Sequence, residues 1–201
     1  MLLDGLYHEN LWYRMARAYF AFFFLLAAAY FFAFFLLPEG CLKDLPIPSS
    51  ALLGETGSLL SLRLKTLGYN LLVLGVIVCA NHFRVRQFTF GYLPLLADTV
   101  ILGLFAGSNS FSGPVSAYSL KGWLLFLRIG FLEFSAYIFA CVSTTKLAMY
   151  HAERWRGQQF RKVRKLKEIA LTFQERLVLA ISLILLFLAA FNEWSAINPR
   201  T

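Results

Sequence analysis

The chain has 201 residues, of which 59% are hydrophobic and only 15% are charged. A soluble domain normally carries about a quarter charged residues, so the composition excludes a disordered chain, a coiled coil and an ordinary soluble enzyme. It predicts an all-α membrane protein, a bundle of transmembrane helices forming one membrane domain over residues 1–201. The formal net charge is +8, and the positions of these charges carry more information than their sum.

Five apolar segments predict five transmembrane helices. The first, residues 18–37, contains no charged residue and would extend about 30 Å as a helix, which is enough to cross a bilayer. A cleaved signal peptide would have a shorter apolar core, followed by a small-residue cleavage site. The other spans are predicted at residues 66–81, 88–107, 122–148 and 177–194.

The third span, residues 88–107, contains residues that disfavour a regular helix. Gly91 and Pro94 stand near its start, and Asp98 lies within it. A proline inside a helix removes a backbone hydrogen bond and clashes with the preceding turn. We therefore expect a kink or a break in this span.

Basic residues distinguish the two sides of the predicted bundle. Arg84 and Arg86 lie between the second and third spans, and residues 149–176 hold eight Lys or Arg against three Glu. Residues 108–119 carry no charge. Because short loops rich in Lys and Arg stay in the cytoplasm, we expect a multi-pass protein of the cytoplasmic (inner) membrane. Its amino terminus would lie inside and its carboxyl terminus outside.

The basic segment 149–176 also has its own pattern. Apolar residues recur within it every three to five positions, between the basic residues. This spacing predicts an amphipathic helix on the inner leaflet that binds anionic lipid. A docking site for an acidic cytoplasmic partner is the alternative. No motif supports binding to nucleic acid.

Several polar residues fall inside the predicted spans. A charge at the bilayer centre costs at least ~2.5–3.5 kcal/mol, so Asp98 and Glu133, both near mid-membrane, need a partner or a function. Arg128, about 9 Å from the outer edge, is expected to reach Asp98 with its long side chain. Glu133 shares a helix face with Gly130 and other small residues, which would let another helix approach closely. Asn70 is expected to hydrogen-bond between helices.

No catalytic, phosphate-binding or metal-binding motif is visible in the sequence. The three cysteines are scattered without a C-x-x-C spacing, and each histidine stands near the edge of a predicted span. We therefore expect no enzyme activity and no cofactor. For Glu133 three roles stay open: a polar lock between helices, a proton or ion relay, and a site for a lipid headgroup or a peptide.

A series of short motifs lies between about residues 60 and 199. They are Asn70 in the second span, Gly103 in the third, Gly130, Glu133 and Ala136 spaced as G-x-x-E-x-x-A, and finally Ala189, Ala190, Glu193 and Pro199. This pattern resembles the stage II sporulation protein M family of five-span membrane proteins. The chain departs from that family at Ile129, where the motif has a histidine, at Arg128, where it has a proline, and at Asp98-Thr99, where it has Asn-Gly.

The resemblance implies a non-enzymatic membrane scaffold or an accessory subunit of a membrane protein complex. Its partners would be other integral membrane proteins or a second copy of the chain. The alternative function is a subunit of a membrane transporter or permease that uses Asp98, Arg128 and Glu133. A water-accessible cavity at Glu133 would distinguish the permease, because a scaffold should be dry there.

Overall fold

The computed structural model describes residues 5–45, 59–111, 115–155 and 159–197, and most of them are helical. The α-helices are α1 (Leu11–Leu36), α3 (Leu59–Ala80), α4 (Tyr92–Gly107), α5 (Leu120–Leu125), α6 (Phe131–Thr144) and α7 (Phe173–Ile197). A π-helical turn, Phe126–Gly130, joins α5 to α6, and short 3₁₀ turns occupy Thr145–Leu147 and Leu166–Glu168. The strands are β1 (Phe83–Val85), β2 (Phe88–Thr89), β3 (Tyr150–Ala152) and β4 (Arg161–Lys162).

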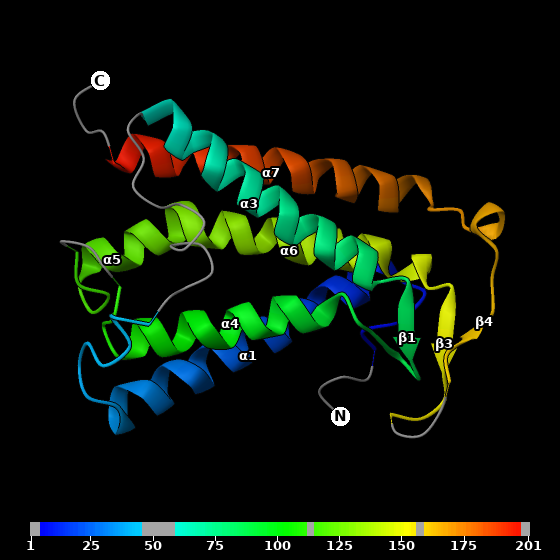
Figure 1. Ribbon diagram of the computed structural model, residues 1–201, viewed down its shortest axis with the longest axis horizontal. Coiled ribbons are helices and arrows are strands. Elements are labelled where there is room, and N and C mark those ends of the chain that lie inside the picture. The colour runs from blue at the N-terminus through cyan, green and yellow to red at the C-terminus, as the bar shows by residue number, and fades with distance from the viewer. Residues whose placement is uncertain (1–4, 46–58, 112–114, 156–158, 198–201) are drawn as a thin grey trace.

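The helices run alternately up and down the long axis of the molecule (Figure 1). The starts of α1, α4 and α7 lie at the end that carries the strands, and the starts of α3 and α5 lie at the opposite end. As a result, α1 starts at the end that carries the strands, and α7 finishes at the opposite end. We call the two ends of the bundle the sheet end and the loop end.

Three helical stretches are long and apolar enough to cross a membrane: Leu11–Leu36, Leu120–Leu147 and Phe173–Glu193. This finding supports the prediction of a membrane protein. Two further apolar helices, Leu64–Ala80 and Tyr92–Gly107, are shorter. The 16 residues of α4 extend about 24 Å, less than the ~30 Å of a typical hydrocarbon core. The count of five spans stays a prediction.

The first and third helices start at different places from those predicted. α1 begins at Leu11 instead of residue 18, because the Asn10 side chain accepts hydrogen bonds from the Trp12 and Tyr13 amides and caps the helix. α4 begins at Tyr92 instead of residue 88. The predicted span 88–107 is interrupted near Gly91, because residues 88–89 form β2 and the helix begins only after Gly91. Pro94 does not interrupt α4, because it occupies the third helical position, where a backbone N–H has no partner within the helix. A further irregular turn occurs at Phe126–Gly130.

The amphipathic helix predicted over 149–176 is also wrong. The described part of this segment forms β3, β4, one 3₁₀ turn and, from Phe173, the first turn of α7, and the chain is therefore not purely α-helical. Its strands join β1 and β2 in a sheet of order β2-β1-β3-β4. β1 pairs with β3 in parallel, with Phe83 opposite Tyr150, whereas the other two pairings are antiparallel. Strand partners 67 positions away therefore outweigh the local helical spacing.

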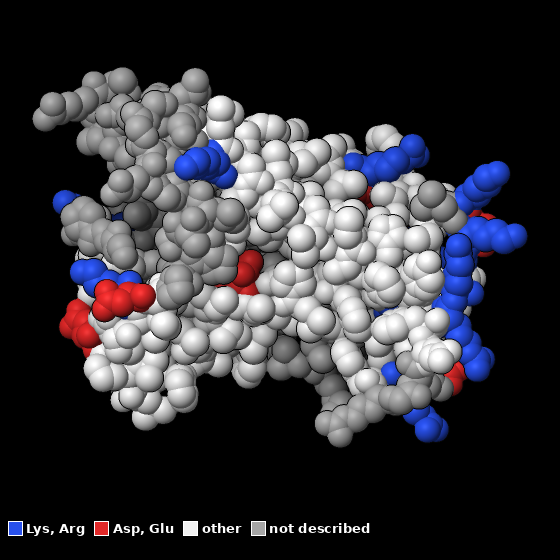
Figure 2. Space-filling view, viewed as in Figure 1, with Lys and Arg blue, Asp and Glu red and all other residues white. Residues whose placement is uncertain are grey.

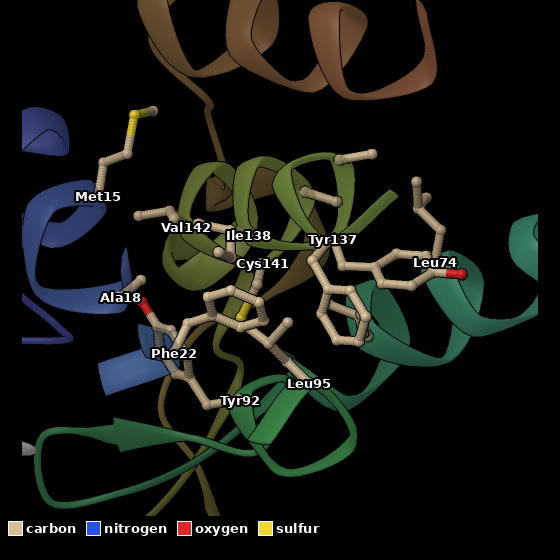
Figure 3. Close-up of a cluster of buried hydrophobic side chains, with 14 of the residues drawn as sticks. Met15, Ala18, Phe22, Leu74, Tyr92, Leu95, Tyr137, Ile138, Cys141 and Val142 are labelled. Atoms are coloured by element: carbon tan, nitrogen blue, oxygen red, sulfur yellow. The ribbon is translucent and has the colours of Figure 1, made fainter. Parts of the chain in front are cut away.

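The core of the bundle surrounds α6. Figure 3 shows Phe22 of α1 and Tyr92 and Leu95 of α4 beside Ile138 and Cys141 of α6. α1 packs against α4 at very short range, because a Cβ added at Gly103 would lie 2.8 Å from the backbone oxygen of Leu26. Small residues at such a contact let helix backbones approach closely, as is common in membranes.

Candidate functional site

Glu133 lies in the first turn of α6 and is half-buried. Its Oε1 accepts a hydrogen bond of 2.9 Å from the hydroxyl of Tyr137, one turn later on the same helix. Tyr137 is only 2% exposed, so the hydroxyl and the carboxylate form one fixed polar unit in the bundle. Ala136 and Ala140, predicted to share this face, are fully buried.

Two other predicted residues lie near Glu133. Asp98 on α4 and Glu193 on α7 are half-buried, and both interact electrostatically with the Glu133 carboxylate. The structure therefore gathers three acidic residues from three helices, which we call the acidic triad. Figure 2 shows acidic side-chain atoms near the middle of this face of the bundle, among mostly uncharged residues. Asn70, also predicted, is buried in α3 with 3% exposure.

Arg128 does not occupy the predicted place. It lies in the π-helical turn, its side chain is exposed, and the ion pairs among the described residues do not include one between Arg128 and Asp98. The predicted pair is therefore wrong for this arrangement. A π turn inserts an extra residue into the helix and changes the direction of its side chains, which sequence spacing based on a regular α-helix could not anticipate.

Gly130 also serves a different neighbour from the one predicted. The atoms nearest to a Cβ added there belong to the ring of Phe126, at 2.8 Å. The glycine therefore leaves room for a side chain of its own π turn rather than for another helix. On the other side of this turn, the Asn192 side chain of α7 donates a hydrogen bond of 3.0 Å to the backbone oxygen of Arg128.

A fully buried asparagine that the sequence reasoning missed joins three helices. Asn81 follows α3, and its Nδ2 donates to the Cys141 oxygen at 2.8 Å and to Thr144 Oγ1 at 2.7 Å, both on α6. Its Oδ1 accepts a hydrogen bond from the amide of Gly91, just before α4, at 3.2 Å. A side chain at Gly91 would overlap Asn81. An Asn at the end of an apolar run was the available signal.

The second missed cluster is a buried ion network at the sheet end. Arg14 of α1 and Glu175 of α7 are each 1% exposed, and Arg14 Nη2 lies 2.7 Å from Glu175 Oε1. Lys146 Nζ lies 3.1 Å from the same oxygen and is 29% exposed. Arg14 also donates a bond of 2.6 Å to the backbone oxygen of His8. We call Arg14, Lys146 and Glu175 the ionic clasp, since they join the start of α1, the end of α6 and the start of α7.

Glu175 also caps its own helix. Its Oε2 accepts hydrogen bonds from the amide and hydroxyl of Thr172, and the Thr172 hydroxyl accepts one from the Glu175 amide. This reciprocal pattern is a capping box, whose signature is Thr or Ser followed three residues later by Glu. The pattern is readable in the sequence at 172–175, whereas nothing in the sequence indicates that Arg14 lies against Glu175.

The polar face of the sheet carries a further set of buried groups. Arg84 on β1 lies beside Thr89 on β2 and His151 on β3, so the three side chains share one face. Arg84 Nε, Thr89 Oγ1 and His151 Nε2 are buried there without a hydrogen-bond partner among the described residues. Burial and, second, the charge of Arg84 lower the pKa of His151, so the histidine is neutral near pH 7. The Arg84 guanidinium rests on the ring of Tyr7, 4.1 Å from its centre.

A shallow pocket of about 380 Å³ opens beside this face at the amino-terminal segment, next to Tyr7, Tyr13 and Arg17. Among the residues that the structure describes, no group of three His, Cys, Asp or Glu side chains is arranged to hold a metal ion. Comparison of the chain with protein-family models, with curated proteins and with solved structures finds no match.

Proposed function

We propose that this chain is a non-enzymatic integral membrane scaffold or an accessory subunit of a membrane protein complex. The observation that carries the proposal is that buried polar side chains join separate helices of the bundle. Asn81 and the ionic clasp each join three separate segments, and each is bonded to neighbouring helices. Bonded polar networks of this kind favour one rigid arrangement. In the ionic clasp the exception is Arg14 Nε, which is buried without a hydrogen-bond partner among the described residues. A rigid bundle suits a protein that holds others in place.

The outer face of α1 supports a partner within the membrane. Phe20, Phe24, Phe31 and Phe35 are each at least half exposed, and Phe20 stacks on Phe24 as Phe31 stacks on Phe35. Phe20 and Phe24 recur as Phe31 and Phe35 after eleven residues, with the exposed alanines 27 and 28 between them. A seam of large and small apolar residues on one helix face is suited to packing against another helix. We propose another integral membrane protein or a second copy of this chain as the occupant.

The resemblance to the stage II sporulation protein M family supports the same proposal. Its motif residues Glu133 and Ala136 lie on α6 and Glu193 lies on α7, and these two helices pack against each other. A role in holding these helices together would explain those residue types without any catalysis. The basic sheet end would lie on the cytoplasmic side of the membrane and the loop end outside.

A purification in mild detergent tests the scaffold. We expect the full chain to migrate as a complex, either with itself or with a second membrane protein, and we expect Phe24→Ala with Phe31→Ala to release it. Phe187→Ala on the exposed face of α7 is the matched control and should leave the complex intact. A chain that migrates as a lone monomer under all mild conditions would refute the proposal.

The acidic triad favours a second candidate, a transporter subunit. The Glu133 carboxylate, with Asp98 of α4 and Glu193 of α7 each within electrostatic range of it, could bind or pass a cation or proton. Two variants separate the candidates. Glu133→Gln keeps an oxygen that accepts the Tyr137 hydrogen bond, so a polar lock should survive it, whereas Glu133→Leu removes the acceptor and should loosen the assembly.

A relay predicts the opposite, because glutamine cannot carry a proton and both variants would lose transport activity equally. Glu133→Cys adds a direct measurement of water access. A scaffold should leave this cysteine unreactive toward a water-soluble maleimide, and a permease should expose it to labelling. Assembly of Glu133→Leu at the level of the unmodified chain would rule out the lock.

A further inference from the structure

Exposed aromatic rings form a continuous surface at the sheet end. Phe83 stacks on Tyr150 with ring centres 5.1 Å apart, and Phe160 meets Phe83 edge-on at 5.6 Å. Phe90 lies 5.7 Å from Phe160 and stacks on Trp155 at 6.2 Å. These five rings come from two segments far apart in the sequence. We call them the aromatic platform.

Strand pairing explains why the rings share one side. Phe83 of β1 and Tyr150 of β3 are register partners, and Tyr150 pairs in turn with Lys162 of β4. Paired residues point to the same face of a sheet, and residues two apart on a strand do so as well. The opposite face holds Arg84 and His151. The sheet therefore separates an aromatic side from a polar side.

The aromatic platform is not part of the hydrophobic core, because three of its rings are exposed on the surface. Trp155 is 56% exposed, Phe160 39% and Phe83 38%. The platform also lies where apolar helices end, since Phe83 follows α3 by three residues and Phe90 precedes α4 by two. Trp and other aromatic rings at the ends of membrane helices sit at the level of the lipid headgroups.

Basic side chains lie in the same described segment as Tyr150, Trp155 and Phe160. Lys162 shares the platform's face of the sheet, whereas Arg161 pairs with His151 on the opposite face. Arg154, Arg161, Lys162, Arg164, Lys165 and Lys167 are all exposed, and the exposed acidic residues of the same described segment are Glu153 and Glu168. Figure 2 shows Lys and Arg side chains gathered along this end of the molecule, beside an uncharged surface. Apolar rings next to an excess of cations complement a surface that offers acyl chains beside negative headgroups.

We infer that the aromatic platform and its basic rim bind anionic lipid headgroups of the leaflet at the sheet end. The rings enter the headgroup boundary and the cations contact the lipid phosphates. A soluble acidic protein would account for the cations but leaves the exposed rings, placed at the membrane ends of α3 and α4, without a role. The inference goes beyond the proposed scaffold function, because it concerns a lipid rather than a protein partner and holds equally for a transporter subunit.

Trp155 is a built-in reporter for this contact. The experiment uses the full chain with the other three tryptophans replaced by Phe, reconstituted in vesicles that contain either brominated phosphatidylglycerol or brominated phosphatidylcholine. Bromine quenches tryptophan fluorescence on contact, so we expect stronger quenching by the anionic lipid. A second chain that keeps only Trp123, on α5 at the loop end, is the matched control and should show no preference.

A charge variant completes the test. Lys162→Gln, Arg164→Gln and Lys165→Gln together should reduce the preference of Trp155 for the anionic lipid by on the order of ten-fold or more. Lys43→Gln with Lys121→Gln, at the loop end, should leave it unchanged. Equal quenching by the two lipids, or a preference that survives the triple variant, would overturn the inference. Quenching by neither lipid would also overturn it and would favour an acidic protein as the occupant.

Discussion

Replacing Glu175 by Leu is the most severe test of how the helices are joined at the sheet end. The substitution would leave the Arg14 guanidinium, 1% exposed, with only backbone oxygens such as that of His8, because the structure shows no other carboxylate bonded to it among the described residues. Removing one partner of a buried ion pair costs about 3–5 kcal/mol. We expect a loss of that size, with the capping of α7 lost as well.

Arg14→Leu should be milder. Glu175 would still have Lys146 at 3.1 Å and two hydrogen bonds from Thr172, so its charge stays compensated. A hydrogen bond to a charged group contributes about 1.5–3 kcal/mol, and Arg14→Leu removes the bond to Glu175 together with the bond to the His8 backbone oxygen. The double variant should cost less than the sum of the two single losses, because no charge is then left buried without its main partner.

The assay is unfolding of the purified full chain in mild detergent by increasing dodecyl sulfate, followed by helical circular dichroism. Arg176→Leu, exposed and adjacent to Glu175, is the matched control and should change the midpoint little. If Arg14→Leu lowered the unfolding midpoint as much as Glu175→Leu, Lys146 would not compensate the Glu175 carboxylate. Losses that simply add in the double variant would refute the clasp itself.

Three further predictions concern packing, pH and topology. Gly107→Val should lower the free energy of unfolding by about 1–3 kcal/mol in the same assay, because the added side chain would overlap the backbone of α1. Gly75 has open space around it, so Gly75→Val should cost less than about 1 kcal/mol. Equal losses for the two variants would contradict the close contact between α1 and α4. The pKa of His151 in the folded chain is below its ordinary value, so its contribution to stability is complete above about pH 6.5 and is lost as the pH falls through the folded pKa. Between pH 8 and pH 5 the unfolding midpoint of His151→Gln should therefore fall less than that of the unmodified chain. Identical pH profiles for the two proteins would contradict this. In intact cells, an impermeant thiol reagent should label the native Cys41, exposed at the loop end, and should not label a cysteine placed at Arg161; the reverse pattern would invert the orientation.

Composition and local pattern were sufficient for the class of protein. Long uncharged runs such as residues 18–37 cannot be kept in water, so hydropathy alone predicts membrane helices, and the structure confirms a mostly helical chain with three helices long enough to span. Residues near mid-span could also be grouped by depth. Counting from the predicted span edges placed Asp98 and Glu133 near the same level, and the structure does bring them within electrostatic range.

Helix boundaries and side-chain directions were less accessible. Asn10 is a common helix-capping residue, and α1 begins directly after it. The predicted span begins only at residue 18, because the charged residues Arg14 and Arg17 precede the uncharged apolar run. The burial of Arg14 depends on a carboxylate 161 positions away, which no local pattern announces. Arg128 was expected to reach Asp98 because of its depth and its long side chain, whereas the structure places it in the π turn at Phe126–Gly130 with its side chain exposed.

The sheet is where tertiary structure decided most. Residues 149–176 have the apolar spacing of an amphipathic helix, and in isolation that spacing is a sound prediction, since periodicity reflects which side chains share a face. Backbone hydrogen bonds to β1 become available only once α3, α4 and α6 bring residues 83–89 beside residue 150. The gain from that pairing and from the stacked rings then exceeds the weak helical preference. Local sequence therefore determined the environment of each segment, whereas the contacts between distant segments determined its final backbone conformation.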